Sequence, residues 1–169
     1  VLGQTENTQP ALLTASVALW DVLQSERAQP VQADAMAGHS LGEYSALVCA
    51  GAMNFVDAVR LVRKRGELMQ QAVPIGQGGM AAVLGLEDAT VRDCCDSVPG
   101  VVTAANYNAP GQVVIAGESA AVEAAISVCK EAGAKRAVAL DVSGPFHSPL
   151  MVAAAEEFSA ALNDVNVVM

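Results

Sequence analysis

The 169-residue sequence has no apolar run as long as the ~18 residues that a membrane-spanning helix needs. It also lacks the basic segment followed by an apolar segment that marks a secretory signal. Basic residues are scarce, since 9 lysines and arginines stand against 18 aspartates and glutamates, for a net charge of −9. Contacts with phosphates supply most of the affinity for nucleic acid, so this balance argues against a nucleic-acid-binding protein. We therefore expect a soluble protein that binds neither membranes nor nucleic acid.

The sequence has only four cysteines, and they show none of the spacings of a zinc site. Cys94 and Cys95 are adjacent, which suits no obvious disulfide framework, and Cys49 and Cys129 lie far from them. This pattern favours buried, reduced thiols in a cytoplasmic protein and predicts no metal site. The hydrophobic content of 53%, in contrast, is high enough for a sizeable core.

Changes of hydrophobic period predict the elements of the first part of the chain. These are a helix over 10–25, a strand over 31–37, and helices over 41–50 and 54–73. Pro10 suits the first turn of a helix, Gly51 a helix end, and Asn54 an N-cap. A buried strand is thus expected to lead through a sharp turn into a helix, with Ser40 in the turn.

Residues 76–143 have a different hydrophobic pattern, which predicts short apolar strands between helices. The predicted strands cover 80–86, 101–108, 112–118 and 136–143, and the predicted helices cover 87–98 and 119–133. This β-α-β-β-α-β order is that of a ferredoxin-like sandwich. After it, a helix is predicted over 149–162 and a short strand over 165–169.

The fold class that these elements predict is α/β. Residues 1–75 and 144–169 are expected to form an α/β-hydrolase-like core with a parallel sheet, into which a ferredoxin-like subdomain, 76–143, is inserted. A parallel sheet that is buried on both faces needs several strands, and only two are found outside the inserted part. The chain also starts without methionine. We expect it to be a piece of a longer protein, with strands of the core missing on both sides.

The stretch "MAGHSLGEYS" (36–45) places a serine between two glycines. The form Gly-x-Ser-x-Gly between a strand and a helix is that of a nucleophile elbow, in which a serine hydroxyl projects from a strained turn. The backbone N–H of Leu41, at the start of the helix, could help to stabilise an oxyanion. The alternative is a turn that serves packing alone.

A serine nucleophile needs a base, and the sequence offers two histidines. His39 adjoins Ser40, so its side chain should point elsewhere, and we assign it to the wall of the pocket. His147, in the loop "VSGPFHSPL" (142–150), is the candidate base, with a plain surface histidine as the alternative. Asp141 would be a weak third member of a triad.

Four of the nine basic residues lie in the segment "RLVRKR" (60–65), namely Arg60, Arg63, Lys64 and Arg65. The cluster is either the solvated face of a helix or an anion site. An anion site here could take a carboxylate, a phosphate or an acidic partner protein.

Four segments together resemble the malonyl-CoA:acyl carrier protein transacylases of bacterial fatty acid synthesis. They are "GHSLGEYSALVCAG" (38–51), "RLVRKRGELMQ" (60–70), "NYNAPGQVVIAG" (106–117) and "SGPFHSPLM" (143–151). They occur in the family's order and are spread along the chain from residue 38 to residue 151. The family's amino-terminal glycine/glutamine motif and its carboxy-terminal glutamine are absent, so one oxyanion donor and one partner of the histidine are missing.

The resemblance implies roles for three residues. Ser40 matches the serine that takes the malonyl group as an ester, and His147 matches the general base and acid. Arg65 matches the arginine that pairs with the malonyl carboxylate. A guanidinium can hold a carboxylate through two hydrogen bonds and reject acyl groups that lack one.

Three further residues are carried over as substrate-binding candidates. Gln9 lies at a position that lines the family's pocket, and Asn108 belongs to a motif near the site. In related acyltransferase domains, a phenylalanine before the histidine accompanies malonyl preference. Phe146 matches it, and a plain core phenylalanine is the alternative.

The activity that the resemblance implies is that of an [acyl-carrier-protein] S-malonyltransferase in fatty acid biosynthesis. Malonyl-CoA and acyl carrier protein would be its substrates, without metal or other cofactor, and we expect a monomer. A polyketide synthase acyltransferase domain and a serine thioesterase or other hydrolase are the alternatives. A carrier-binding module without catalysis is a third.

Overall fold

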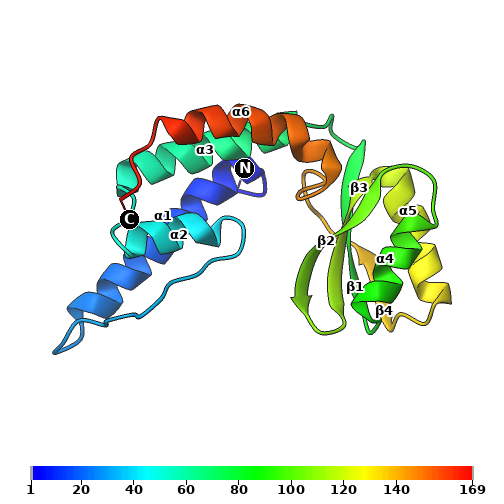
Figure 1. Ribbon diagram of the computed structural model, residues 1–169, viewed down its shortest axis with the longest axis horizontal. Helices are drawn as coiled ribbons and strands as arrows, with labels where there is room; N and C mark the ends of the chain where they lie inside the picture. The colour runs from blue at the N-terminus through cyan, green and yellow to red at the C-terminus, as the bar shows by residue number, and fades with distance from the viewer. Residues whose placement is uncertain (1, 169) are drawn as a thin grey trace. The chain divides into compact units, whose positions relative to one another are not determined.

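The computed structural model describes residues 2–168, which form two compact units (Figure 1). One unit comprises the described residues of Val1–Leu68 and Glu156–Met169, and the other comprises Met69–Ala155. The boundary falls within two helices, α3 (Phe55–Gln71) and α6 (Val152–Asn163). We call the units the helical unit and the sheet unit and describe each by itself.

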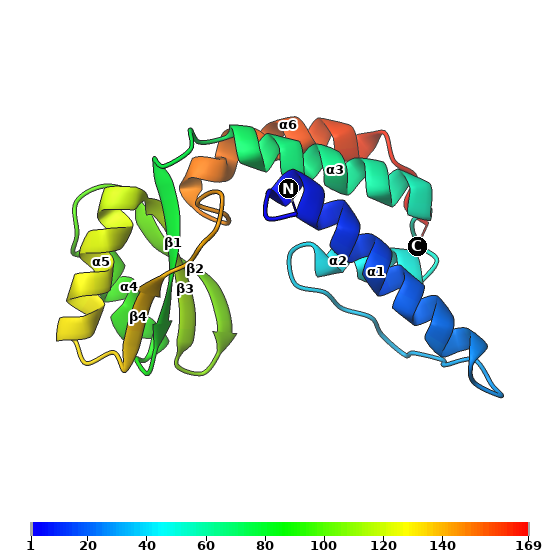
Figure 2. The ribbon, with the colours of Figure 1, turned by 180° about the vertical axis from the view of Figure 1, so that it is seen from behind.

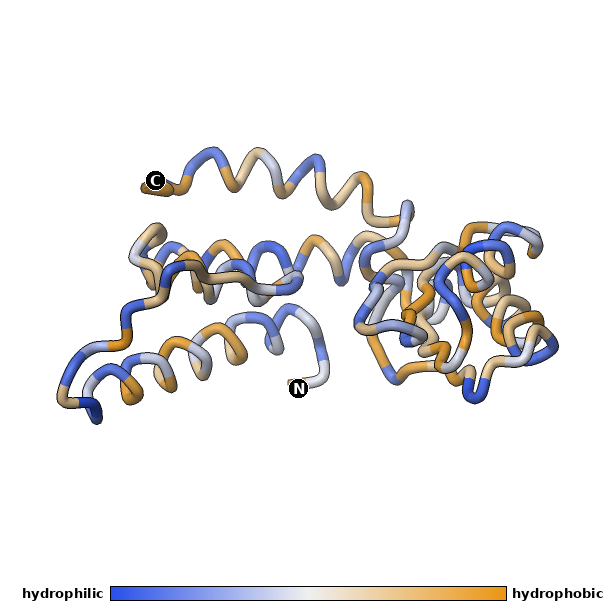
Figure 3. Tube along the Cα trace, turned by 60° about the horizontal axis from the view of Figure 1, so that its bottom comes forward, coloured by the Kyte–Doolittle hydropathy of each residue, from blue (hydrophilic) through white to orange (hydrophobic). Residues whose placement is uncertain are grey.

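The helical unit contains α1 (Thr5–Ser25), α2 (Gly42–Cys49) and most of α3 and α6. Figures 1 and 2 show α3 beside α6 from both sides. The core between the helices consists of Leu13, Tyr44, Met53, Ala58, Leu61 and Val62, with Phe158 of α6 packed against it. Figure 3 shows that α1 alternates apolar and polar stretches, and several of its apolar side chains, such as Leu19, remain exposed.

Local sequence signals account for the ends of these helices. Asn54 caps α3, because its Oδ1 accepts hydrogen bonds from the backbone N–H of Val56 (2.9 Å) and of Asp57 (3.4 Å). Gly51 follows α2 with φ of 74°, a left-handed conformation that favours glycine at a helix end. The predicted cap and the predicted helix end are both confirmed. The first helix starts earlier than predicted, so Pro10 lies inside α1 and not in its first turn.

The helices α1 and α3 cross at Gly66, which is buried. A Cβ atom at this position would lie 2.5 Å from the Cα of Glu6 and 2.9 Å from its N. Arg63, one turn earlier, donates from Nη1 to the carbonyl oxygen of Glu6 (3.2 Å) and to Oδ1 of Asn7. The first turn of α1 is therefore held against α3, which fixes where Gln9 lies.

The strand predicted over 31–37 is wrong, because these residues form no strand. A strand requires hydrogen bonds to a neighbouring strand, and the described residues of the helical unit provide none beside this segment. The side chain of Gln24 instead bonds Val31, donating to its carbonyl oxygen (3.1 Å) and accepting from its N–H (2.7 Å). At 165–169 the predicted strand is reduced, over the described part, to one antiparallel bridge between Met53 and Val167, and Met169 lies outside the described residues.

The sheet unit follows the predicted order of strands and helices. Its elements are β1 (Gly78–Leu84), α4 (Asp88–Asp96), β2 (Val102–Ala109), β3 (Gln112–Glu118), α5 (Ser119–Glu131) and β4 (Arg136–Ala139). The strands form one antiparallel sheet in the order β2-β3-β1-β4. Figure 2 shows α4 and α5 on the same face of this sheet. The molecule is thus mixed α/β with a small antiparallel sheet.

The core of the sheet unit lies between the sheet and its two helices. It includes Val83, Val91, Ile115, Val122 and the three cysteines of this unit, Cys94, Cys95 and Cys129. All four cysteines of the chain are free thiols, as predicted, although Cys49 is only half-buried. Burial raises the pKa of Cys95 to about 11 and that of Cys129 to about 12. None of the described helices is long and apolar enough to span a membrane.

Candidate active site

Ser40 lies in a tight turn that requires glycine at position 38. Its φ is 53°, in the left-handed region that non-glycine residues rarely adopt. A Cβ atom at Gly38 would overlap the backbone carbonyl of Gly42, so only glycine fits there. The turn is closed by the N–H of Gly42, which donates to the carbonyl oxygen of His39 (2.9 Å). A strained turn of this kind, just before a helix, is the geometry of a nucleophile elbow.

A chain of hydrogen bonds joins Ser40 to Arg65 and Gln9, two residues that the sequence indicated. Arg65 donates from Nη2 to the Oγ of Ser40 (3.0 Å) and from Nη1 to the Oε1 of Gln9 (2.8 Å). Gln9 is buried in α1 and donates from Nε2 to the Oγ1 of Thr5 (2.9 Å), which orients its amide oxygen toward the arginine. The structure therefore brings together residues of α1, the elbow and α3.

This arrangement has a chemical consequence for the serine. Because Oγ accepts a hydrogen bond from a cation, the alkoxide that forms during attack is stabilised relative to the hydroxyl. Arginine carries five N–H donors, so donors remain for a second ligand when Gln9 and Ser40 are bound. The same guanidinium can therefore serve the nucleophile and a carboxylate close to it.

The other basic residues of the 60–65 segment are already paired. Arg60 lies 3.9 Å from Asp57, and Arg63 contacts Glu67 (2.7 Å) and Glu6 (3.6 Å). Lys64 of α3 pairs with Glu157 of α6 at 3.1 Å. Within residues 2–168, no carboxylate lies within ion-pair distance of Arg65. Arg65 is thus the member of the cluster that can receive the carboxylate of a ligand.

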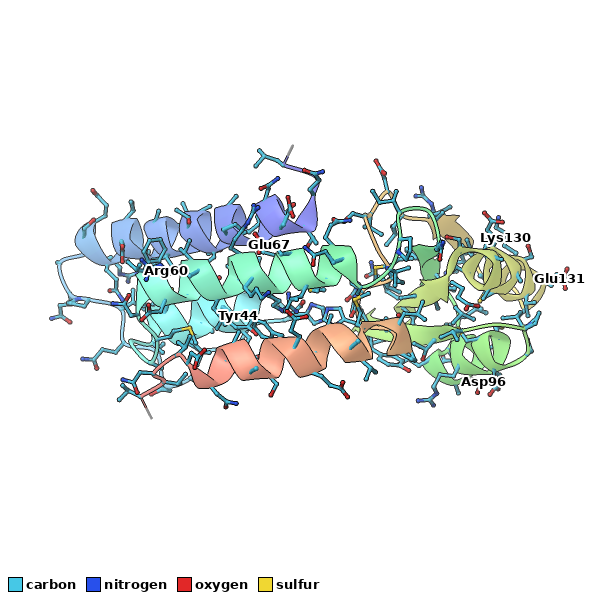
Figure 4. All side chains as sticks on the ribbon, turned by 90° about the horizontal axis from the view of Figure 1, so that it is seen from above. Tyr44, Arg60, Glu67, Asp96, Lys130 and Glu131 are labelled. Atoms are coloured by element: carbon cyan, nitrogen blue, oxygen red, sulfur yellow. The ribbon has the colours of Figure 1, made fainter. Side chains whose placement is uncertain are left out.

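Tyr44 completes this group, although no motif in the sequence pointed to it. The Cζ of Arg65 lies 5.7 Å from the centroid of the Tyr44 ring, within the range of a cation–π contact. Figure 4 shows Tyr44 inside the helical unit, and its ring meets Phe158 edge to face at 6.2 Å. Burial raises the pKa of Tyr44, while burial lowers the pKa of Arg65. Tyr44 follows Ser40 by four residues and lies in the first turn of α2, which was the available signal in the sequence.

The backbone N–H of Leu41 is the predicted oxyanion donor. The hydrogen bonds that close the elbow use the N–H groups of Gly42, Glu43 and Tyr44 as donors, and that of Leu41 is not among them. Leu41 itself directly precedes α2, which adds the partial positive charge of a helix N-terminus. His39 is exposed beside it.

The loop of His147 belongs to the sheet unit. His147 is exposed and has a φ of 61°, so it shares the strained left-handed conformation of Ser40. The residues on either side are fixed, because Pro145 is fully buried and the Oγ of buried Ser148 donates to its carbonyl oxygen (2.7 Å). Ser148 also caps a short 3-10 helix, η1 (Pro149–Met151). An exposed histidine thus lies between two buried residues of the loop.

The remaining predicted site residues also lie in the sheet unit. Phe146 is half-buried and packs with Met80, Val114 and Ala116 in a second apolar cluster of the sheet unit. Asn108 is exposed on β2, where the pairing with β3 shifts register. Asp141 lies beyond the end of β4, which stops at Ala139, so its predicted place on a strand is wrong. In the described part of the chain, no three histidine, cysteine or acidic side chains gather as a metal site would.

Comparison with known proteins shows the family. A model of the acyl transferase domain matches residues 1–168, nearly the entire chain. The chain belongs to the acyl transferase domain family.

The chain is also similar to individual proteins of known name and structure. The chain is 58% identical over 163 residues to the malonyl CoA-acyl carrier protein transacylase of Salmonella typhimurium, covering 95% of this chain and 52% of that protein. An acyl carrier protein S-malonyltransferase structure from Vibrio cholerae is 54% identical, with a TM-score of 0.92 over 98% of this chain and 54% of that one. A malonyl-transacylase solved with a type II polyketide synthase acyl-carrier protein is 50% identical, with a TM-score of 0.92 over 99% and 54%. The chain spans about half the length of the relatives it matches.

Proposed function

We propose that this acyl transferase chain is part of a malonyl-CoA:acyl carrier protein transacylase. The observation that carries the proposal is Arg65, a cation without a carboxylate partner among the described residues, hydrogen-bonded to the Oγ of Ser40 at 3.0 Å. A carboxylate held by Arg65 would lie next to the nucleophile, as the short malonyl group requires. The names of the relatives support the same substrate.

The proposed reaction runs in two halves. His147 takes the proton of Ser40 while Oγ attacks the thioester carbonyl of malonyl-CoA, and the oxyanion is stabilised by the N–H of Leu41. The C–S bond then breaks, CoA leaves with the proton from His147, and a malonyl-serine ester remains. The thiol of the phosphopantetheine arm of acyl carrier protein loses its proton to His147 and attacks this ester. Ser40 is released with that proton, and malonyl carrier protein leaves.

Substrate selection in this proposal comes from Arg65 and Phe146. The guanidinium binds malonyl groups through the carboxylate, which acetyl groups lack. Phe146 would crowd the α-carbon, where a methyl group is worth about 1–3 kcal/mol of discrimination. Gln9 would orient Arg65, while His39 and Asn108 would line the pocket. No cofactor is part of the proposed chemistry.

The finer fold assignment is also a proposal. The sheet order β2-β3-β1-β4 with both helices on one face supports a ferredoxin-like subdomain over 76–143. Residues 1–75 and 144–169 would belong to an α/β-hydrolase-like core. In this proposal, the segment 31–37 would become a strand once neighbouring strands of the longer protein are present.

Acyl carrier protein is the proposed partner, in a cytoplasmic and monomeric enzyme. Its acidic surface would need a basic patch, because this chain carries a net charge of −9. Arg60, Arg63 and Lys64 are engaged by carboxylates of the helical unit. In the described chain, Lys130, Lys135 and Arg136 form no ion pair, so we favour the sheet unit as the docking surface. Lys130, labelled in Figure 4, lies in the last turn of α5.

A polyketide pathway is the second candidate, and one observation favours it. One structural relative was solved with the acyl-carrier protein of a type II polyketide synthase. The transfer reaction would be the same, and only the carrier would differ. A thioesterase is disfavoured, because it would have to admit water to the ester and would need no carboxylate-binding arginine.

The test is intact-protein mass spectrometry of the full-length protein after brief mixing with malonyl-CoA. We expect one malonyl adduct, which Ser40→Ala abolishes and the matched control Ser45→Ala retains. Addition of holo acyl carrier protein should remove the adduct and place it on the carrier. No adduct under conditions that label a known transacylase would refute the proposal, and rapid release of free malonate would favour the hydrolase.

A further inference from the structure

Tyr44 on α2 contacts the guanidinium of Arg65, which makes it a candidate for a role beyond packing. The distance from the Cζ of Arg65 to the ring centroid is 5.7 Å. Tyr44 therefore supports the arginine from a third direction, in addition to Gln9 and Ser40.

We propose that Tyr44 is a positioning residue that holds Arg65 beside Ser40 and thereby sets the preference for acyl groups with a carboxylate. The inference rests on the proposed malonyl transfer and adds a selectivity determinant to it. Tyr44 would not touch the reacting atoms. Its effect would be exerted entirely through Arg65.

Arg65 needs such support because of what surrounds it. Its neighbours on α3, Arg63 and Lys64, are held by carboxylates, whereas among the described residues Arg65 has no carboxylate within ion-pair distance. A long arginine side chain has many rotamers, and ordering it costs conformational entropy. A fixed aromatic ring can restrict those rotamers while leaving the N–H donors free for a carboxylate. A carboxylate in the same place would neutralise the arginine and block the substrate.

The ring of Tyr44 is itself fixed before any substrate binds. Its exposure is 9%, and Phe158 of α6 meets it edge to face, with an interplanar angle of 75°. It belongs to the apolar cluster between α1, α2 and α3. Burial raises the pKa of Tyr44, so the ring stays neutral at physiological pH. The arginine is thus preorganised by the core of the helical unit.

The test compares three variants of the full-length protein. Tyr44→Leu removes the ring, Tyr44→Phe removes only the hydroxyl, and Phe158→Leu disturbs the same cluster while leaving the ring on Arg65. The rates of Ser40 acylation by malonyl-CoA and by acetyl-CoA are measured for each by rapid-quench mass spectrometry. Their ratio reports on Arg65, whereas general damage to the fold lowers both rates together. Circular dichroism melts confirm that each variant is folded.

We expect Tyr44→Leu to lower the malonyl-to-acetyl rate ratio on the order of tenfold, as the loss of a cation–π contact implies. Tyr44→Phe should recover much of the ratio, and Phe158→Leu should lower it much less than Tyr44→Leu does, because the ring itself stays on Arg65. An unchanged ratio in folded Tyr44→Leu would overturn the inference, as would an equal change in Phe158→Leu. If the wild type gains no malonyl adduct at all, the proposed function fails and this inference fails with it.

Discussion

Replacing Gly66 with alanine tests how the site is assembled. Glycine has no side chain that could take part in the reaction, so any effect must come from the packing of the helices. In the structure, a Cβ atom at Gly66 would lie 2.5 Å from the Cα of Glu6, whereas ordinary contacts begin at 3.4 Å. The helices α1 and α3 must therefore separate by about 0.9 Å at their crossing. Gln9 lies one turn further along α1, so its 2.8 Å hydrogen bond to Arg65 should lengthen or break.

Two opposing effects set the change in stability. Overpacking of a close contact costs about 1–3 kcal/mol. Alanine is favoured over glycine inside a helix by about 1 kcal/mol, which offsets part of that cost. We expect a net loss of about 0–2 kcal/mol in the free energy of unfolding. Loss of a hydrogen bond to a charged group is worth about 1.5–3 kcal/mol, so malonyl transfer to Ser40 should slow roughly 10- to 100-fold.

The assay is urea unfolding followed by fluorescence, together with the rate of malonyl labelling of Ser40, on the full-length protein. Gly3→Ala is the matched control, because it also lies near the start of α1 and a Cβ atom there would meet nothing within 4 Å. It should leave stability and labelling unchanged. If Gly66→Ala labels as fast as wild type, then the α1–α3 crossing does not set the position of Gln9 and Arg65, and the reasoning is refuted.

Three further predictions concern charge and protonation. Arg65→Lys should keep the positive charge but lose the forked geometry, so malonyl labelling should fall about tenfold and acetyl labelling by clearly less, and an equal fall in both would contradict the assignment. Reversing the charges of Lys135 and Arg136 together should raise the KM for acyl carrier protein without changing malonyl labelling; an unchanged KM would remove them from the docking surface. Because burial raises the pKa of Cys95 to about 11 and of Cys129 to about 12, from 9.0, both thiols favour the folded state below pH 9. That stability should be lost progressively as pH rises from 9 toward 12, and the melting temperature of Cys129→Ala should fall less steeply over this range.

Local signals predicted most of the sheet unit and the helices. The turn at Pro110 and Gly111, with apolar runs on both sides, defined β2 and β3 closely, and β3 has the predicted bounds of 112–118. Asn54 identified the start of α3, because an asparagine cap acts within one turn of the chain. These are cases in which neighbouring residues decide the conformation.

The features that were predicted wrongly or not at all share a physical cause. Each depends on contacts with residues that are distant in the sequence. The segment 31–37 has the composition of a buried strand, but a strand forms only beside another strand. The contact between Arg65 and Tyr44 was likewise not predicted, since it depends on how α2 packs against α3. Separate motifs in the sequence indicate Ser40 and Arg65, and only the fold shows the hydrogen bond between them.

The basic segment shows most clearly how a pattern in sequence differs from a pattern in space. Successive residues of a helix point about 100° apart, so Arg63, Lys64 and Arg65 face three different neighbours. Arg63 reaches Glu6 of α1, Lys64 reaches Glu157 of α6, and Arg65 reaches the elbow at Ser40. The first two hold α3 in place through carboxylates that cancel their charge. Of the four basic residues that the sequence presents as one cluster, three therefore lie beside carboxylates in the fold, and Arg65 has no carboxylate within ion-pair distance among the described residues.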